Sequence, residues 1–161
     1  MSIATGGLLS LASPAFLPRQ PIPRRFTCDG ENVSPRLSWH GVPQQVEAFA
    51  VIMEDPDAPR GLFTHWTYYD LPRRLRELPD NVDKVDWPSP GGVQAVNDFG
   101  TVGYDGPCPP PGSAHHYRLM VFALDRVLGL PPRHTVRDLR QSMLGHVLAQ
   151  GQLVGFYKRG R

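Results

Sequence analysis

The hydrophobic positions of the chain predict strands more often than helices. Residues 46–53, VEAFAVIM, are apolar at nearly every position, which is typical of a strand covered on both faces. Residues 63–70, FTHWTYYD, are rich in aromatic and β-branched side chains and predict a second strand. Residues 117–125, YRLMVFALD, predict a third strand whose alternate side chains point to opposite faces. One face would carry Leu119, Val121 and Ala123, and the other Met120, Phe122 and Leu124.

The last third of the chain carries the clearest helix signal. Thr135 and Asp138 form a T-x-x-D capping pattern. Gly151 is the expected end of this helix, and residues 153–158, LVGFYK, are a candidate for a last strand. The apolar residues that follow the cap at helical spacing are Val136, Leu139, Met143, Val147 and Leu148.

Prolines and glycines divide the rest of the chain into short pieces. The 18 prolines and 16 glycines are spread throughout, which indicates turns between strands. A short strand between two turns is expected in residues 26–43, and a short helix over residues 73–78. The polar stretch 79–103 is predicted to be a loop, and loops of that length are often functional. We therefore predict one mostly β domain, residues 1–161, with a few peripheral helices and an irregular N-terminal extension over residues 1–20.

Composition narrows the classes of function. A chain of 161 residues with 40% hydrophobic and 20% charged residues is typical of a globular domain. The formal net charge of +2 is too small to indicate a nucleic-acid partner, and no stretch approaches the roughly 20 apolar residues of a membrane span. The start, MSIATGGLLSLASPAF, has no basic residue before its short apolar part, which argues against a secretion signal. A cytoplasmic location is expected, with Cys28 and Cys108 as reduced thiols.

Two acidic residues follow the strand predicted at residues 46–53. Asp55 and Asp57 flank Pro56 in EDPDAPRG, and a further proline restricts the backbone of this turn. Asp and Pro are ordinary turn residues, so this cluster alone does not indicate a site. His65, inside the aromatic strand, would likewise be an ordinary core or surface residue if it stood alone.

A stiff loop carries the third polar cluster. GYDGPCPPPGSAHHY, residues 103–117, places four prolines ahead of two adjacent histidines. Neighbouring side chains of an extended backbone point to opposite faces, so His115 and Tyr117 would share a side that His116 does not. Adjacent histidines are a poor metal signature, although two histidines and two carboxylates leave a metal site open as an alternative. An imidazole oriented by a carboxylate would suit a small anion, with further donors from the N–H groups of Gly106, Cys108 or Gly112.

Three blocks of the sequence, taken in order, resemble the phosphatidylethanolamine-binding protein family. They are DPDAP at residues 55–59, His65 in the aromatic strand, and GPCPPPG followed by HHY within residues 106–117. FTCDGENVSPRLSW and NDFGTVGYDGPCPP are similar to the bacterial branch of that family, often labelled Raf-kinase-inhibitor-like. The family usually has an arginine where this chain has His116, and we expect that change to affect packing or a surface ion pair more than binding.

The resemblance implies a fold and a site. The fold would be a large central antiparallel sheet packed on a smaller sheet. The site would be a shallow surface pocket for phosphate-like groups, acetate or a phospholipid head group. Carried over by position, its lining would be Asp55, Pro56, Asp57, Phe63, His65, Cys108, Pro110, His115 and Tyr117.

The function expected from these residues is anion binding without catalysis, with no metal and no cofactor. By analogy with eukaryotic relatives, the protein would regulate a partner such as a kinase, and the bacterial relatives suggest a homodimer. The alternative is a small hydrolase that uses His65 or His115 with Asp55 or Asp57, or with Cys108 as nucleophile. A protease inhibitor is a third hypothesis, for which the sequence shows no diagnostic loop.

Overall fold

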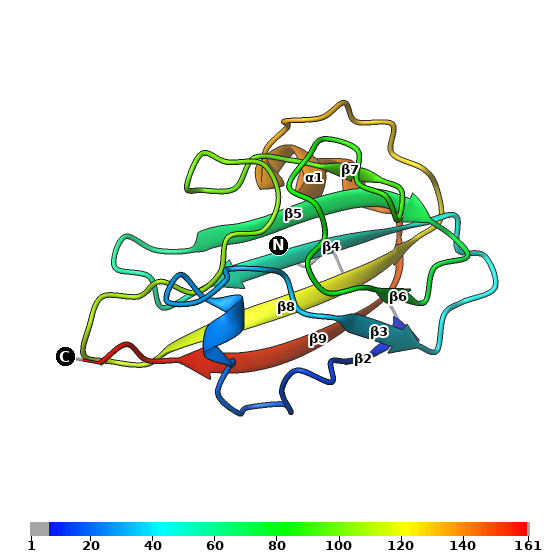
Figure 1. Ribbon diagram of the computed structural model, residues 1–161. Coiled ribbons are helices and arrows are strands. Elements are labelled where there is room, and N and C mark those ends of the chain that lie inside the picture. The colour runs from blue at the N-terminus through cyan, green and yellow to red at the C-terminus, as the bar shows by residue number, and fades with distance from the viewer. Residues whose placement is uncertain (1–6, 161) are drawn as a thin grey trace.

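The computed structural model describes residues 7–160, which form two β-sheets and two short helices (Figure 1). The larger sheet has the strand order β1-β9-β8-β4-β5-β7, and the smaller sheet has the order β2-β3-β6. The strands of the larger sheet are β1 (Gly7–Leu8), β4 (Ala48–Asp55), β5 (Phe63–Pro72), β7 (Val93–Gln94), β8 (His115–Leu124) and β9 (Val147–Tyr157). The smaller sheet contains β2 (Ser10–Ala12), β3 (Leu37–His40) and β6 (Glu77–Leu78), and the helices are the 3-10 helix η1 (Arg24–Phe26) and α1 (Val136–Met143).

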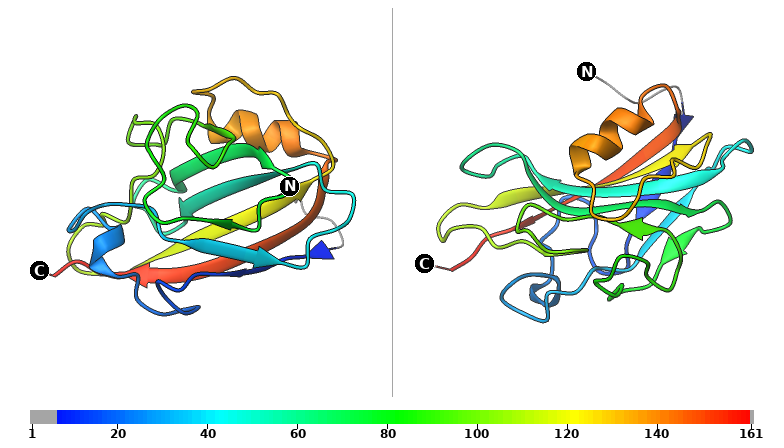
Figure 2. Two further views of the ribbon diagram at one scale, coloured as in Figure 1. Left: turned by 45° about the vertical axis from the view of Figure 1, so that its right-hand side comes forward. Right: turned by 90° about the horizontal axis from the view of Figure 1, so that it is seen from above.

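The larger sheet is covered on both faces. Every residue of β4 is buried, as the unbroken apolar run predicts. One face packs against the smaller sheet, where the ring of Trp39 in β3 lies 5.3 Å from that of Phe49 in β4. The other face packs against α1 through Leu139 and Met143. Figure 2 shows α1 on its own side of this sheet. The fold is therefore mostly β, a large sheet on a smaller one, as expected.

The three long strands predicted from the hydrophobic pattern are present. They correspond to β4, β5 and β8, each shifted or extended by a few residues. In β8, Leu119, Val121 and Ala123 join the core that contains the smaller sheet. The alternate residues Met120, Phe122 and Leu124 join the core under α1. The two-sided alternation of this strand is thus confirmed.

The N-terminal part of the described chain differs from the expectation. An irregular extension over residues 1–20 was predicted, and residues 1–6 lie outside the described residues. From Gly7 onward, β1 pairs with β9 and β2 pairs with β3. The β1–β9 pairing is parallel, so the larger sheet is mixed and not purely antiparallel. Strands of two or three residues have no periodicity of their own, and they form here because a neighbouring strand supplies partners.

The predicted C-terminal helix begins where expected and ends early. The Thr135 hydroxyl accepts a hydrogen bond from the Asp138 N–H at 3.3 Å, which is the predicted cap. The helix stops at Met143, since the backbone turns at Leu144 and Gly145, and Gly145 has a φ of +81°. Val147 and Leu148 therefore begin β9, and Gly151 lies inside that strand.

Two further expectations need correction. Residues 73–78 form a turn and then β6, not a helix. The stretch 79–103 is mostly loop but contains β7, which pairs with β5. No helix within residues 7–160 is long and apolar enough to cross a membrane.

Gly151 is required where the N-terminal segment crosses β9. A Cβ atom at this position would lie 2.4 Å from the backbone oxygen of Leu9. We expect Gly151→Ala to lower the free energy of unfolding by about 1–3 kcal/mol, because the backbone of Leu9 must move. Urea denaturation measures this. The exposed neighbour Gln152 is the control, and Gln152→Ala should change stability by less than about 0.5 kcal/mol. Equal stability of the two variants would contradict the steric account.

Candidate functional site

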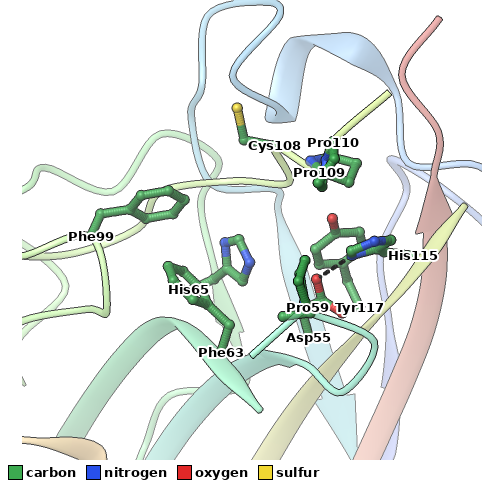
Figure 3. A pocket seen from close by; sticks show the side chains of 11 residues that line it. Asp55, Pro59, Phe63, His65, Phe99, Cys108, Pro109, Pro110, His115 and Tyr117 are labelled. Carbon is green, nitrogen blue, oxygen red and sulfur yellow. Dashed lines mark hydrogen bonds and ion pairs between the residues drawn. The ribbon is translucent and has the colours of Figure 1, made fainter. Parts of the chain in front are cut away.

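The antiparallel register places the end of β4 beside the starts of β5 and β8, at one edge of the larger sheet. Asp55 at the end of β4 lies opposite Phe63 at the start of β5. Glu54 lies opposite Arg118, near the start of β8. Together with the loops that follow β4 and precede β8, these ends enclose a pocket of about 130 Å³ (Figure 3). Its lining residues are Asp55, Ala58, Pro59, Phe63, His65, Phe99, Cys108, Pro109, Pro110, His115 and Tyr117.

A buried pair formed by His115 and Asp55 lies on one side of the pocket. The Nδ1 atom of His115 is 2.7 Å from Oδ2 of Asp55, and both side chains are less than a tenth exposed. The other oxygen of Asp55 accepts the backbone N–H of Asp57 at 2.7 Å. Because the carboxylate only accepts, Nδ1 is the protonated nitrogen of this contact. The Nε2 atom of His115 is then left for a ligand.

His65 is oriented in the same way by a backbone carbonyl. Its Nδ1 atom lies 2.7 Å from the carbonyl oxygen of Asp105, so Nδ1 carries a proton and Nε2 is unprotonated in the neutral ring. Burial lowers the pKa of His65 below its ordinary value of 6.5, although the carbonyl contact and nearby carboxylates act in the opposite direction. The Asp105 side chain is itself held by hydrogen bonds from Asn32, Lys84, Asn97 and Thr101.

The ring of Tyr117 contacts both imidazoles. Its centroid lies 5.3 Å from that of His65 and 6.5 Å from that of His115. Its hydroxyl is buried and has no hydrogen-bond partner among residues 7–160. Burial raises the pKa of this hydroxyl well above its usual range, so it remains a neutral donor. The hydroxyl is therefore an unpaired donor in the wall of the pocket.

Phe63 and Phe99 supply an aromatic wall. Their rings lie 4.8 Å apart, and each also contacts the ring of His65. Phe63 was expected from the family pattern, whereas Phe99, Ala58, Pro59 and Pro109 were not. The motif NDFGTVGYDGPCPP, which resembles the bacterial branch, contains Phe99 and would have indicated it if read position by position.

The proline-rich loop is held against the N-terminal segment. The N–H of Gly106 donates to Oδ1 of Asn32 at 2.8 Å, so it is not the free anion donor that the sequence suggested. A Cβ atom on Gly106 would lie 2.0 Å from the oxygen of Phe26, which explains the glycine. Cys108 carries the one backbone N–H between residues 107 and 111, because the other four residues are prolines. That N–H has no hydrogen-bond partner within the described chain.

The two cysteines form a disulfide, which contradicts the expectation of reduced thiols. Cys28 and Cys108 are 80 residues apart in sequence, with Cα atoms 5.4 Å apart. They meet because the Cys28 N–H donates to the carbonyl oxygen of Pro107 at 3.0 Å. The pairing removes the thiol that a hydrolase mechanism through Cys108 would need.

Seven of the nine residues expected in the pocket line it, and Pro56 and Asp57 do not. The carboxylate of Asp57 instead accepts the backbone N–H of His116 at 2.8 Å and faces its ring nitrogen at 2.9 Å. These contacts, chiefly the backbone hydrogen bond, lower the pKa of Asp57. Asp57 therefore ties the turn after β4 to the exposed side of β8, where its carboxylate contacts the ring of His116 at the surface.

The pocket combines apolar walls with few polar groups. When both imidazoles are neutral, Asp55 is the one charged side chain among the lining residues. Within residues 7–160, no three His, Cys, Asp or Glu side chains are placed to hold a metal ion. The groups that can donate a hydrogen bond to a ligand are the Tyr117 hydroxyl, the Cys108 N–H and either imidazole once its Nε2 is protonated.

The sequence is similar to known proteins over nearly its whole length. The family model for phosphatidylethanolamine-binding protein matches residues 12–158. A UPF0098 protein of Aquifex aeolicus is 46% identical over 159 residues, which cover 97% of this chain and 92% of that protein. A UPF0098 protein of Methanothermobacter thermautotrophicus is 46% identical over 152 residues, covering 94% of this chain and all of that protein.

Two solved structures share the fold. A phosphatidylethanolamine-binding protein homologue from Chlamydia trachomatis superposes with a TM-score of 0.86 at 34% identity, over 96% of this chain and 99% of that one. E. coli YbcL, described as a new member of the mammalian family, superposes with a TM-score of 0.86 at 29% identity, over 94% and 98% of the two chains.

The lowered pKa of His65 has a consequence for stability. The unfolded chain takes up a proton near pH 6.5, whereas the folded protein does so only at lower pH. The contribution of His65 to the free energy of unfolding is therefore present above pH 6.5 and is lost as the pH falls toward the folded pKa. An NMR titration of the imidazole should give a midpoint below 6.5, and exposed His116 provides a comparison in the same spectra. A midpoint for His65 above 6.5 would contradict the burial argument.

Proposed function

The chain belongs to the phosphatidylethanolamine-binding protein family, and from that premise we propose that its pocket binds a small phosphate or carboxylate anion without catalysing a reaction. The ligand class includes free phosphate, phosphate esters, the head group of a phospholipid, and acetate-like carboxylates.

One observation carries this proposal: two imidazoles from different strands line a single apolar-walled pocket. The Nδ1 atom of each ring is already engaged, by Asp55 and by the carbonyl of Asp105, so each ring can offer Nε2 to a ligand. The Tyr117 hydroxyl adds a donor without a partner among the described residues. Convergent donors between hydrophobic walls are typical of a small-molecule site.

The size of the pocket limits what it can enclose. A volume of about 130 Å³ is well below the roughly 300–1,000 Å³ of pockets that enclose a drug-sized ligand. A phosphate or carboxylate group fits within that space, whereas the chains of a phospholipid would remain outside. We therefore propose head-group recognition and not enclosure of a whole lipid.

The charges of the pocket imply that binding is coupled to proton uptake. Asp55 carries a negative charge that would repel an anion. Its two oxygens accept hydrogen bonds from His115 and from the Asp57 N–H, which partly offset that repulsion. The Tyr117 hydroxyl and the Cys108 N–H are neutral donors, so an anion gains charge attraction within the pocket when Nε2 of an imidazole is protonated. We propose that the anion binds together with a proton taken up by His65 or His115.

The hydrolase alternative has little support in this site. Cys108 is in a disulfide, and no serine or threonine is among the lining residues. A His–Asp pair is present in His115 and Asp55, but its role here is to orient the ring toward a ligand. A homodimer and a regulated partner protein such as a kinase stay predictions taken from relatives, and a cytoplasmic location stays a prediction from the sequence. Light scattering would test the homodimer.

Removal of either imidazole should weaken anion binding. We expect His65→Ala and His115→Ala each to weaken binding of inorganic phosphate at least about tenfold, because a hydrogen bond to a charged group contributes about 1.5–3 kcal/mol. Titration calorimetry measures this, with circular dichroism to show that the fold is retained. His116→Ala is the matched control, since this ring is exposed and lies outside the pocket. Unchanged affinity in both pocket variants would refute the proposal.

Proton uptake predicts a pH dependence. We expect phosphate and acetate to bind more tightly at pH 5.5 than at pH 8, because the protonated imidazole is the better donor to an anion. Acetate separates this effect from the protonation of phosphate, since acetate is ionised at both pH values. An affinity for acetate that is equal at the two pH values would count against contact with the histidines.

A further inference from the structure

The disulfide lies at the rim of the pocket. Cys108 lines the pocket and is exposed to solvent, whereas Cys28 is half-buried on the N-terminal segment before β3. Figure 3 shows Cys108 beside Pro109 and Pro110 on the wall of the pocket. The bond therefore joins a pocket wall directly to a segment 80 residues away in sequence.

The contacts of the proline-rich loop are unevenly distributed. Up to residue 107 the loop is well anchored without the disulfide. The Tyr104 hydroxyl donates to the oxygen of Phe26 at 2.7 Å, and the Gly106 N–H donates to Asn32. Residues 109–114, in contrast, make no hydrogen bond within the described chain, and five of these six residues are exposed. Between residue 107 and the start of β8 at His115, the disulfide is the one covalent anchor of the pocket wall.

The charges around the two sulfurs are asymmetric. Nη1 of Arg159 lies 3.7 Å from Sγ of Cys108, and its Nη2 is paired with Oδ1 of Asp29 at 2.9 Å. Asp29 directly follows Cys28 in sequence and also accepts the Tyr157 hydroxyl. A guanidinium beside one sulfur and a carboxylate next to the other favour negative charge on Cys108 over Cys28. The other titratable groups that line the pocket with Cys108 are His65, His115, Tyr117 and Asp55.

We propose that the Cys28–Cys108 bond is a redox latch on the pocket: its reduction releases the wall at residues 108–114 and weakens anion binding, while the sheets stay folded. The inference rests on the proposed anion-binding function and adds a mode of regulation to it. It also reconciles the disulfide with the expected cytoplasmic location, because disulfides in that compartment are usually transient or redox-sensing.

The exchange needs an external dithiol, which is the reductant. One thiolate of the dithiol attacks Sγ of Cys28, a new S–S bond forms, and the electron pair of the broken bond leaves on Sγ of Cys108. The second thiol of the reductant, as its thiolate, then attacks the mixed disulfide and releases Cys28, which takes a proton from solvent. The dithiol is oxidised to a disulfide, and the protein is reduced by two electrons.

Calorimetry with inorganic phosphate tests the latch on the complete protein. Cys28→Ser removes the bond without substituting any residue that lines the pocket and leaves Cys108 as the thiol that reduction also produces. We expect reduced wild type and Cys28→Ser to bind phosphate at least about fivefold more weakly than oxidised wild type, because the wall must be ordered on binding. Equal affinities with an intact fold would overturn the proposal.

A second measurement does not depend on phosphate. Heteronuclear NOE values of the amides of Gly112, Ser113 and Ala114 should fall on reduction, while those of β4 and β8 stay unchanged. If oxidised protein fails to bind phosphate but these values fall, the proposed function is wrong, whereas the release of the wall by reduction is supported. If the values do not change, the latch is wrong whatever the affinity.

Alkylation identifies the more reactive sulfur. In reduced protein, iodoacetamide should label Cys108 severalfold faster than Cys28, and Arg159→Gln should reduce that difference. Lys158→Gln changes a neighbouring positive charge and is the control. Equal labelling of the two cysteines in wild type would contradict the assignment of Cys108 as the leaving thiolate.

Discussion

The buried hydrogen bond between His115 and Asp55 is the interaction on which the site depends. It joins β4 to β8 at the pocket edge, it fixes the proton of His115 on Nδ1, and it engages one oxygen of Asp55. A carboxylate left unpaired at that depth would repel an anion and would cost free energy to bury. With the pair formed, His115 presents Nε2 to the pocket, and the carboxylate of Asp55 is engaged in hydrogen bonds.

The strand pairing of the larger sheet brings Asp55 and His115 together. Antiparallel pairing of β4 with β5 and β8 puts Asp55, His65 and His115 near one edge of the sheet, although they are up to 60 residues apart in sequence. The cores on the two faces of the sheet fix the strands that carry them. The pocket wall is different, because residues 109–114 make no hydrogen bond within the described chain and a disulfide joins the adjacent Cys108 to Cys28. Rigid strands thus hold the donors, and the part most open to regulation lies outside the sheets.

Much of this architecture could be predicted from local sequence, and the failures have physical causes. β4 was predictable because a continuous apolar run is typical of a strand buried on both faces, whereas β5 was indicated by aromatic and β-branched residues and β8 by its alternation. The end of the helix after Thr135 was predicted too late in the chain, because Val147 and Leu148 continue its apolar spacing. The turn that ends it depends on the positive φ of Gly145. β1 and β2 are too short to carry a pattern of their own.

The candidate site could likewise be predicted only in part from the sequence. The family pattern predicted His65, His115, Tyr117 and Asp57 in one pocket. The first three line it, whereas the carboxylate of Asp57 contacts His116 outside it. The disulfide left no local signal, since its cysteines are 80 residues apart and have ordinary neighbours.

The central claim is that the Nε2 atoms of His65 and His115 hold an anion together. The most direct test is a long-range ¹H–¹⁵N spectrum of the histidine rings recorded at pH 7 during addition of phosphate. The Nε2 signals of His65 and His115 should both shift with one shared dissociation constant, at least one of them toward the protonated position, while the signals of exposed His116 stay in place. Signals of both pocket histidines that do not move at saturating phosphate would contradict the account.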